Sequence, residues 1–469
     1  MFLPARQSES YHVSCTICYC QYPRATTAPN TKEYYVTSTR RRLSIGLSVL
    51  AVTSTFLLAA CSSTGTTAQS TKSDPTSVVT VWTDATRQPG FEQFQKTHPS
   101  IKLKISTIPT SIFTKLQLFN RTGSGWPDVI FDGNTNDIAT LAGKQLNYAQ
   151  PLDGKLTAAE KSGFAASNTV CKVDGVLSCI RNDVAPTVLW YDASLIKQFG
   201  YEVPKTWEEY EALSEKVAKD HPGYVMGALG DVFTYYNNFQ SVGCPIQNVT
   251  GPNAVHIDLT ESSCTRMATI LDTMLKNGTL LRSGTFDPDT IAAAKAGKIL
   301  MMPGANWYGS AVFESKSLYS LPNGRLSAAP ALALGSNKAY SGSAGGGIYV
   351  VSRHAKNMDG AVAVAKWMAT NVAFQMTAPT YPAYAPAATE WSKAITASTF
   401  FASDPVPVLK AQTILVNPIN NFATRYEPAT AFTDVIVAAI RAKTSILSAL
   451  PALQSRLIDS AKSQGYTVK

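Results

Sequence analysis

The sequence has few of the side chains that catalytic and metal sites use most often. Its 469 residues include five histidines: His12, His98, His221, His256 and His354. No His-x-x-x-His, Gly-x-Ser-x-Gly or phosphate-binding loop occurs, and no Cys-x-x-Cys follows Cys20. We therefore expect no metal, no cofactor and no enzyme activity. A glycosidase needs only two carboxylates, so composition leaves a secreted carbohydrate-active enzyme open as an alternative.

Charged side chains are also sparse, at 16% of residues, and the formal net charge is +9. Residues 1–60 hold six basic and two acidic side chains, which leaves +5 for the rest of the chain. No block of Lys and Arg occurs after Arg42. Since a basic patch is the electrostatic footprint of nucleic-acid binding, we expect no nucleic acid as a partner.

One long apolar run is present, from Leu43 to Leu58. It lies between the basic run 40–42 and the sequence Leu-Ala-Ala-Cys at 58–61. A positive segment, an apolar stretch and small residues before a cysteine form an export signal. The pattern resembles the bacterial lipobox, in which Cys61 begins the mature chain and carries a lipid. A plain transmembrane anchor is the alternative, but a spanning helix needs about 20 apolar residues.

This signal predicts an extracytoplasmic protein that is attached to the cell membrane by its lipid anchor only. Residues 1–60 form the signal region, and residues 1–35 need not be translated if Val36 is the true start. The three cysteines of that segment could suggest a metal site, but they would leave with the signal. The Ser/Thr-rich residues 61–77 are typical of a flexible tether.

Four cysteines remain after Cys61, and an even number outside the cytoplasm favours disulfides. Cys171 and Cys179 flank an Asp-Gly pair at 174–175, which is a strong hairpin signal. We therefore predict a Cys171–Cys179 disulfide and, by elimination, a Cys244–Cys264 disulfide. Free buried thiols are the alternative.

Beyond residue 77, strand patterns alternate with helix patterns, which predicts an α/β fold with an open sheet. Thr206 and Glu209 have the spacing of a capping box. Strands are expected at 78–82, 101–105 and 127–131, and helices around 91–95, from 206, and at 267–275, 361–368 and 432–450.

The order of these segments resembles the bacterial extracellular solute-binding proteins of the sugar-binding type, of which maltose-binding protein is the familiar member. Matching segments run collinearly along most of the mature chain: Thr97–Leu103, Gly125–Val129, Leu146–Leu152, Val173–Gly175, Val188–Asp192 and Pro204–Glu209. Two departures are Asp192, where the family has Asn, and Cys179–Arg181, where it has Gly-Leu-Pro. The second departure puts ligand contacts near 181–183 in doubt.

The resemblance implies a clamp of two α/β lobes that closes on a ligand. Lobe 1 would comprise residues 78–186 and 342–395, and lobe 2 residues 187–341 and 396–469. The chain would cross between them near 184–189, near 341–347 and after Trp391. As a member of this family, the protein would act as a monomer that delivers a sugar or short oligosaccharide to an ABC permease. The alternative ligands are a glycerol phosphate, a polyol or a peptide.

The resemblance also implies where ligand contacts lie. Trp307, with Asn306 and Tyr308, follows a strand in the way of a family tryptophan that stacks on sugar, although it could be a core residue. Asp84 follows the first strand and could instead cap the next helix. The pair Asp132 and Asn134 follows the third strand, where turn formation is the alternative.

Further candidates follow from matching family segments. Asp183 lies at the first crossing and could pair with Arg181 as a hinge salt bridge. Gly345 lies in a glycine run that allows close backbone approach or merely a turn. The remaining candidates are acidic or aromatic: Asp231, Phe233, Tyr236, Tyr381, Tyr384 and Tyr426.

Overall fold

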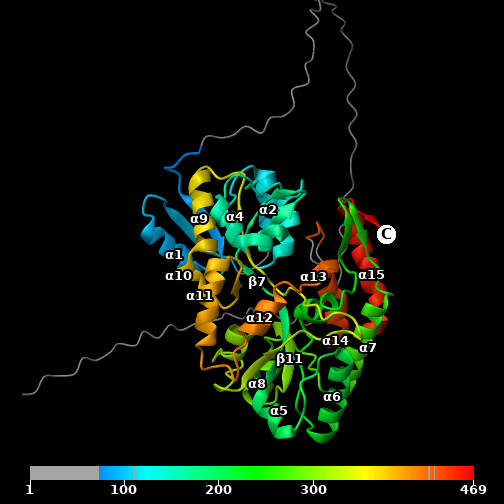
Figure 1. Ribbon diagram of the computed structural model, residues 1–469. Coiled ribbons are helices and arrows are strands. Elements are labelled where there is room, and N and C mark those ends of the chain that lie inside the picture. Colours follow the sequence, from blue (N-terminus) through cyan, green and yellow to red (C-terminus); the bar gives the residue numbers. More distant parts are fainter. Residues whose placement is uncertain (1–72, 109–111, 421–422, 427) are drawn as a thin grey trace, which may run out of the picture. The chain divides into compact units, whose positions relative to one another are not determined.

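The computed structural model describes residues 73–108, 112–420, 423–426 and 428–469 (Figure 1). The predicted signal region, Cys61 and residues 61–72 of the predicted tether lie outside these ranges. Within them, residues 73–77 already contact the folded chain, since Asn357 Nδ2 donates to the carbonyl oxygens of Pro75 and Ser77 at 3.2 and 3.1 Å. No helix in the described part is long and apolar enough to cross a membrane.

The first lobe is built on a mixed five-stranded sheet with the order β2-β1-β3-β13-β6. Strand β1 runs parallel to β2 and β3, whereas β13 runs antiparallel to β3 and β6. Strands and short pairs of this lobe are β1 (Val79–Thr83), β2 (Leu103–Thr107), β3 (Val129–Asp132), β4 (Lys172–Val173), β5 (Val176–Leu177), β6 (Ile180–Arg181), β7 (Asp183–Val184), β13 (Ile348–Val351) and β14 (Tyr381–Pro382).

Helices cover this sheet because their apolar residues recur on one face. Phe91 and Phe94 of α1, for example, are buried against the same core as Val79 and Val81 of β1. The helices of this lobe are α1 (Gln88–Thr97), α2 (Ile112–Thr122), α3 (Ile138–Ala142), α4 (Ala158–Phe164), α9 (Met358–Thr370) and α10 (Val372–Gln375), with the 3₁₀ turns η1 (Thr135–Asp137) and η2 (Ala165–Cys171).

The second lobe has its own core around an antiparallel sheet of order β11-β8-β12, and a second small sheet of order β15-β10-β9. Its strands are β8 (Thr187–Asp192), β9 (Asn248–Gly251), β10 (Ala254–His256), β11 (Met301–Ala305), β12 (Leu326–Ala329) and β15 (Thr467–Val468). Its helices are α5 (Ala193–Phe199), α6 (Trp207–Asp220), α7 (Ser262–Lys276), α8 (Pro288–Lys295), α12 (Val406–Gln412), α13 (Pro428–Phe432), α14 (Ala438–Arg441) and α15 (Ile446–Ser463), with the turns η3 (Tyr235–Gln240), η4 (Gly309–Phe313), η5 (Pro418–Asn420) and η6 (Thr433–Val437).

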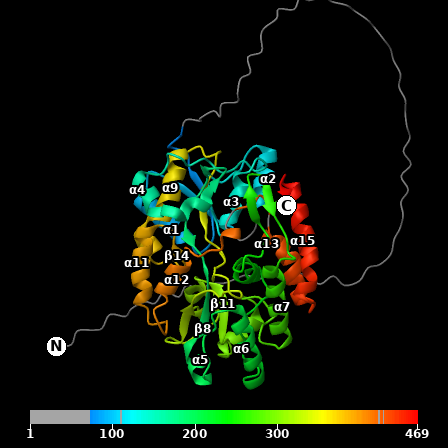
Figure 2. The ribbon, with the colours of Figure 1, turned by 45° about the vertical axis from the view of Figure 1, so that its right-hand side comes forward.

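Two chain segments that join the lobes lie side by side. The first leads from β7 to β8, and the second leads from β12 to β13. They share backbone hydrogen bonds, with Thr187 N donating to Gly342 O at 3.1 Å and Ala344 N to Ala185 O at 3.0 Å. A third connection runs through α11 (Ala385–Thr396), since Ala383 belongs to the first core and Trp391 to the second (Figure 2). The lobes are therefore connected by an ordered, hydrogen-bonded hinge.

The helix predicted over 432–450 is wrong as one element. The chain instead forms η6 and α14, breaks at Lys443, which has a positive φ of 61°, and restarts as α15. Asp272 of α7 explains the restart, because its carboxylate accepts hydrogen bonds from Ile446 N at 2.8 Å and Leu447 N at 3.1 Å. A partner from another helix thus reinforces this boundary, which Ser445 also caps locally by accepting from Ser448 N at 3.2 Å.

The predicted N-cap Thr206 is confirmed, since its hydroxyl accepts from Glu209 N at 3.1 Å. The reciprocal half of the predicted capping box is wrong. Glu209 accepts from Lys205 N at 2.7 Å rather than from Thr206 N. A complete capping box is formed instead by Thr157 and Glu160 at the start of α4.

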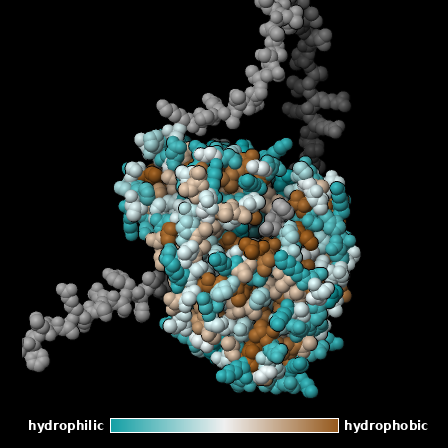
Figure 3. Space-filling view, in the orientation of Figure 1, coloured by the Kyte–Doolittle hydropathy of each residue, from teal (hydrophilic) through white to brown (hydrophobic). Residues whose placement is uncertain are grey.

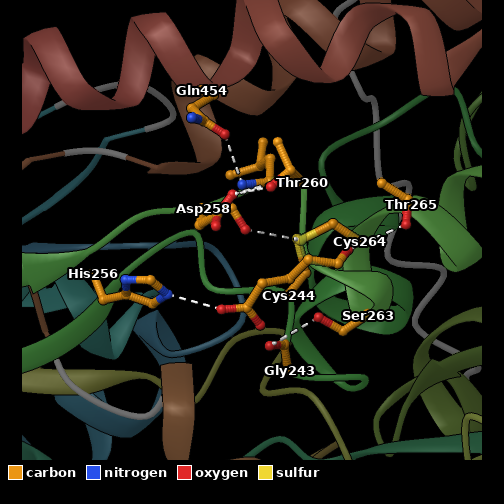
Figure 4. Close-up of a disulfide and its surroundings, with 11 residues drawn as sticks. Gly243, Cys244, His256, Asp258, Thr260, Ser263, Cys264, Thr265 and Gln454 are labelled. Atoms are coloured by element: carbon orange, nitrogen blue, oxygen red, sulfur yellow. Dashed lines mark hydrogen bonds and ion pairs between the residues drawn. A yellow bond between two sulfur atoms is a disulfide. The ribbon is translucent and has the colours of Figure 1, made fainter. Parts of the chain in front are cut away.

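Both predicted disulfides are confirmed. Cys171–Cys179 closes the β4–β5 hairpin, whose turn residues Asp174 and Gly175 both have positive φ as that turn requires. Cys244–Cys264 joins the segment after η3 to α7, and Figure 4 shows it beside Gln454 of α15, which accepts from Leu259 N at 2.7 Å. This second bond therefore fastens a region where three segments of the second lobe meet.

Removal of the Cys244–Cys264 disulfide by a double Cys→Ser change is expected to lower the free energy of unfolding by about 3 kcal/mol in the chain-entropy model. The matching change at Cys171–Cys179 is expected to cost slightly less, because that bond closes a loop of 8 rather than 20 residues. Urea unfolding monitored by circular dichroism measures both values. Equal stability of both variants and the wild type would contradict the expectation.

A histidine ties the C-terminal strand to α7. His256 Nε2 lies 2.8 Å from Glu261 Oε1, and its Nδ1 lies 3.1 Å from Lys469 O. The hydrogen bond with the Glu261 side chain raises the pKa of His256 above its ordinary value of 6.5. The protonated histidine is therefore favoured in the folded state.

Replacing His256 by Ala is expected to lower the melting temperature at pH 5.5 more than at pH 8.5. A raised folded pKa gives stability that is fully present below the unfolded value of 6.5 and is lost as pH rises through the folded pKa. Thermal unfolding of the wild type, His256→Ala and Glu261→Gln at both pH values tests this. The same loss at both pH values would show that the pair stabilises the fold independently of protonation.

Candidate ligand-binding site

Three aromatic rings from three separate loops of the second lobe form a cluster. Trp307 follows β11, Phe233 precedes η3 and Phe286 precedes α8. The ring centroids of Phe233 and Trp307 are 5.4 Å apart at 68°, and those of Phe286 and Trp307 are 6.3 Å apart at 4°. All three side chains retain solvent exposure, and Phe286 is 37% exposed. Together Trp307, Phe233 and Phe286 form an aromatic wall.

The Trp307 ring has a fixed orientation. Its Nε1 donates to Ala344 O at 2.8 Å, and Tyr308 contacts it with ring centroids 4.6 Å apart. Tyr308 itself is fully buried, and burial raises the pKa of its phenol well above the ordinary value. Tyr308 therefore supports the wall from the core, and we do not retain it as a ligand contact.

Asp231 holds two of the aromatic loops together. One carboxylate oxygen, Oδ1, accepts from Phe233 N at 3.0 Å, and the other, Oδ2, accepts from Thr285 N in the loop that carries Phe286. Burial raises the pKa of this carboxyl. The sequence predicted a ligand contact at Asp231, whereas both oxygens serve the protein itself, so its role is to position Phe233 and Phe286.

The first lobe presents carboxylates at the ends of its parallel strands. Asp84 after β1 and Asp132 at the end of β3 line a cavity of about 230 Å³ together with Asp137 and the aromatic rings of Trp82, Phe113 and Phe131. Carboxyl ends of parallel strands meet at one sheet edge, which explains why residues 48 positions apart become neighbours. This cavity offers hydrogen-bond acceptors beside apolar ring surface.

The alternatives that the sequence left open for these residues are partly realised. Asp84 accepts from Arg87 N at 2.8 Å and lies 3.1 Å from Arg87 Nη1, so it does fasten the start of α1. Asp132 accepts from Asn134 N at 3.0 Å, and Asn134 Oδ1 accepts from Asn136 N at 3.2 Å, which is turn chemistry. Asp84 and Asp132 therefore have structural partners as well as a position in the cavity, whereas Asn134 lies beside it in the turn.

Gly345 lies between the aromatic wall of the second lobe and the carboxylate-lined cavity of the first lobe. A Cβ atom added there would lie 3.5 Å from Trp307 Nε1 and 3.8 Å from Gly133 O, next to Asp132. Its φ of +114° also favours glycine. The predicted residues Asp132, Gly345 and Trp307 are therefore brought together, although they are far apart in the sequence.

Two predicted site residues at the hinge, Asp183 and Asn306, form hydrogen bonds with other residues of the chain. The Asp183 side chain is buried and its Oδ1 accepts from Gly347 N at 3.0 Å and from Asn182 Nδ2 at 2.6 Å. Asn306 Nδ2 donates to Val184 O at 2.9 Å. Both residues therefore join crossing segments. Each also keeps an oxygen outside these bonds, because Asn306 Oδ1 is buried without a hydrogen-bond partner and the bonds of Asp183 involve Oδ1, so both stay predicted ligand contacts.

Arg181 contacts the backbone of Asp183, and not its carboxylate as the predicted salt bridge would require. Arg181 Nε donates to the backbone oxygen of Asp183 at 2.9 Å, while the cation nearest its carboxylate is Arg87, with Nη2 at 3.8 Å. Burial lowers the pKa of Arg181 to about 10. Arg181 therefore stabilises the backbone of the first crossing.

The other predicted tyrosines have aromatic or backbone partners outside the three rings of the wall. Tyr236 is buried against Tyr235, and Tyr426 is buried with its hydroxyl donating to Ile246 O at 2.9 Å. Tyr381 contacts Trp391 and Tyr384 contacts Phe164, both beside α11. Tyr381 also lines a larger, mostly apolar cavity of about 780 Å³ between η2, β14, α11 and α12, and Figure 3 shows apolar side chains in the region of α12.

The sequence reasoning missed Phe286. No family segment covered it, and a single aromatic residue before Asp-Pro gives no periodic signal. No group of three or more His, Cys, Asp or Glu residues in the described ranges is arranged to hold a metal ion.

Comparisons with known proteins agree with this architecture. A family model described as bacterial extracellular solute-binding protein matches residues 80–373. A search of curated protein sequences found no match.

Several solved structures share the fold. The galacto-N-biose-/lacto-N-biose I-binding protein of an ABC transporter from Bifidobacterium longum matches with a TM-score of 0.70 and 17% identity, covering 85% of this chain and all of its own. The GacH receptor of Streptomyces glaucescens gives 0.65 and 19%, covering 83% and 99%. Maltose-bound MalE3 of T. maritima gives 0.63 and 16%, covering 81% and 99%. The likeness concerns the fold and confirms the predicted two-lobed α/β architecture.

Proposed function

Because this chain belongs to the bacterial extracellular solute-binding protein family, we propose that it captures a sugar or short oligosaccharide between its lobes and delivers it to an ABC permease. We further propose that Cys61 carries the lipid that holds the mature protein at the outer face of the cell membrane. The protein would act as a monomeric receptor and not as an enzyme.

The observation that carries the sugar assignment is the pairing of the aromatic wall with the carboxylate-lined cavity. A sugar has an apolar ring face and an edge of hydroxyl groups. Aromatic rings such as Trp307 complement the face, and carboxylate or amide oxygens such as those of Asp132 and Asn134 accept from the hydroxyls. The solved proteins with this fold are named as complexes with lacto-N-biose, acarbose and maltose, which supports the same ligand class.

Charge at the site favours a neutral ligand. Phosphate groups bind best to arginines with free donors. Arg87, a cation beside the first-lobe carboxylates, is paired with Asp84, and Arg425 donates to Asn253 Oδ1 at 2.7 Å. Lys115 lies over the ring of Trp82, with Nζ 5.3 Å from the ring centroid. A glycerol phosphate is therefore a weaker candidate than an uncharged sugar.

The two-lobed fold can couple ligand binding to closure of the lobes. A ligand that contacts Trp307 in one lobe and Asp132 in the other binds the closed form better than the open one, and so shifts the population toward closure. Closure about the hydrogen-bonded crossings would create the surface that a permease recognises.

A thermal-shift screen tests this proposal. The purified protein is melted in the presence of mono- and oligosaccharides, polyols, glycerol phosphates and peptides. A ligand that binds only the folded state raises the melting temperature by mass action, so one sugar class is expected to give a shift. A rise in melting temperature with phosphates or peptides and none with sugars would overturn the sugar assignment. If a glycoside that raises the melting temperature were also hydrolysed by the protein, the non-enzyme assignment would be overturned.

A further inference from the structure

The cavity of about 780 Å³ that Tyr381 lines is called the hinge cavity below. Its walls are residues of η2, β14, α11, α12 and the segment 413–416, and it shares no lining residue with the aromatic wall or the carboxylate-lined cavity. Val184 of the first crossing lines it, and so does Val416, which pairs with Ser341 of the second crossing. Ligand pockets in proteins measure roughly 300–1,000 Å³, so the hinge cavity has room for a small molecule.

The surface of the hinge cavity is mostly apolar. Its polar side chains are the Tyr381 phenol, hydroxyl groups of Ser and Thr, and cations. Some of these hydroxyls are engaged within α11, since Ser392 donates to Ala388 O at 2.7 Å and Thr389 donates to Ala385 O at 3.0 Å. Pockets with such walls bind ligands through apolar contact, with a small number of polar groups that fix the orientation. The hinge cavity therefore suits a ligand with an apolar body.

An aliphatic side chain of the lining extends into solvent. Ile414 is 85% exposed, which is the largest value among the six prominently exposed large apolar side chains of the described chain. Its segment is fixed by hydrogen bonds, with Leu415 N donating to Gln412 O at 3.0 Å and Ser341 N to Leu415 O at 2.9 Å. Exposed apolar area is unfavourable unless something covers it, and the apolar body of a ligand in the cavity would cover Ile414.

The charged side chains that line the hinge cavity are all cations: Arg181, Lys393 and Lys410. Lys393 is paired with Glu390 at 2.8 Å, whereas no ion pair found among the described residues includes Arg181 or Lys410. Arg181 is buried and donates to two backbone oxygens at 2.9 and 3.1 Å, and with a pKa of about 10 it remains a cation at neutral pH. A buried charge without a counterion is costly, so an anion would be favoured here.

We propose that the hinge cavity is a second ligand site, which binds an amphipathic anion: a molecule with an aliphatic or aromatic body and one carboxylate or similar acidic group. The body packs against the apolar lining and covers Ile414. The acidic group is attracted by the cations of the lining, of which Lys410 is the most accessible because it is exposed on α12. This site is separate from the proposed sugar site and does not depend on it.

The test compares two probes that share an alkyl chain and differ in the sign of their charge, decanoate and decyltrimethylammonium. In calorimetric titrations of the purified protein below the micelle concentrations, decanoate is expected to bind with a Kd of about 1 mM or lower, and the cationic probe about tenfold more weakly. Ile414→Ser is expected to weaken decanoate binding about tenfold, because apolar contact is lost.

The charge reversal Lys410→Glu separates electrostatic from structural effects. It is expected to weaken decanoate binding about fivefold and to strengthen binding of decyltrimethylammonium by about the same factor, which a loss of folding would not do. The matched controls are Leu118→Ser, at a 51% exposed side chain of α2, and Lys276→Glu, at an exposed position of α7. Neither residue lines the hinge cavity, and neither substitution is expected to change the affinity.

Three outcomes would overturn the proposed site. They are no binding of decanoate, equal binding of the two probes by the wild type, and decanoate binding that Ile414→Ser and Lys410→Glu leave unchanged, since the probe would then adhere elsewhere. Melting temperatures equal to that of the wild type confirm that the variants are folded. None of these outcomes bears on the sugar assignment, which the thermal-shift screen tests separately.

Discussion

Replacing Trp307 by Ala is expected to weaken sugar binding by about 2 kcal/mol or more, which corresponds to roughly 30-fold in the dissociation constant. Trp307 is the central ring of the aromatic wall, because Phe233, Phe286 and Tyr308 all contact it. Its loss would remove the main stacking surface and also the hydrogen bond from Nε1 to Ala344 O. Few single contacts in a binding site carry so large a share of the affinity.

Calorimetric titration with the sugar found in the melting screen measures the effect. Trp307→Phe separates the two contributions, since it keeps a ring but removes the donor to Ala344. Trp126→Ala is the matched control, because Trp126 stacks on His354 in the first lobe and belongs to no part of the wall. An affinity for Trp307→Ala equal to that of the wild type would show that Trp307 is a packing residue.

Replacing Gly342 by Ala is expected to lower the free energy of unfolding by about 3 kcal/mol, which is the upper range for overpacking. A Cβ atom at this position would lie 1.8 Å from the backbone oxygen of Tyr236, and backbone cannot move aside as a side-chain tip can. The second crossing would have to shift away from η3. That shift would strain the bond from Gly342 N to Thr187 Oγ1, now 2.8 Å, and the bond from Ser343 N to Gln240 Oε1, now 2.7 Å.

Urea unfolding of Gly342→Ala against the wild type measures this destabilisation. Gly251→Ala is the control, because the added Cβ would meet only Ala254 Cβ at an ordinary 3.7 Å, and its expected effect is within about 0.5 kcal/mol. Equal stability of Gly342→Ala and the wild type would mean that the crossing adapts without cost, and would contradict the close approach described above.

Local patterns in the sequence were sufficient for several features of the fold. The β-branched run at 78–82 and the alternation at 101–105 predicted strands that appear as β1 and β2 with small shifts, and the Asp-Gly turn predicted the β4–β5 hairpin. The Thr206 cap also depends only on residues next to it. Where a distant residue intervenes, as Asp272 does at the start of α15, the local pattern predicted one helix and the structure has several.

The candidate site was predicted less completely, for the same physical reason. The sequence predicted ligand contacts at Trp307, Phe233, Asp132 and Gly345, because each lies in a segment that matches the family. It could not separate side chains that face the cavity from those that hold the protein together. Asp231 and Asp183 are both acidic, but each also accepts a hydrogen bond from an amide far along the chain, at Thr285 and Gly347.

The sequence by itself determined the class of protein, the pairing of the cysteines and the positions of β1, β2, β3 and the β4–β5 hairpin, because these depend on short spacings and on an ordered series of motifs. Only the tertiary structure decided which residues form the aromatic wall. Phe286, Phe233 and Trp307 lie in loops separated by more than 20 residues from one another, and they meet because one carboxylate, Asp231, holds two of those loops and the core residue Tyr308 supports the third. A contact between distant segments leaves no periodic trace in the chain, so it becomes visible only when the chain is folded.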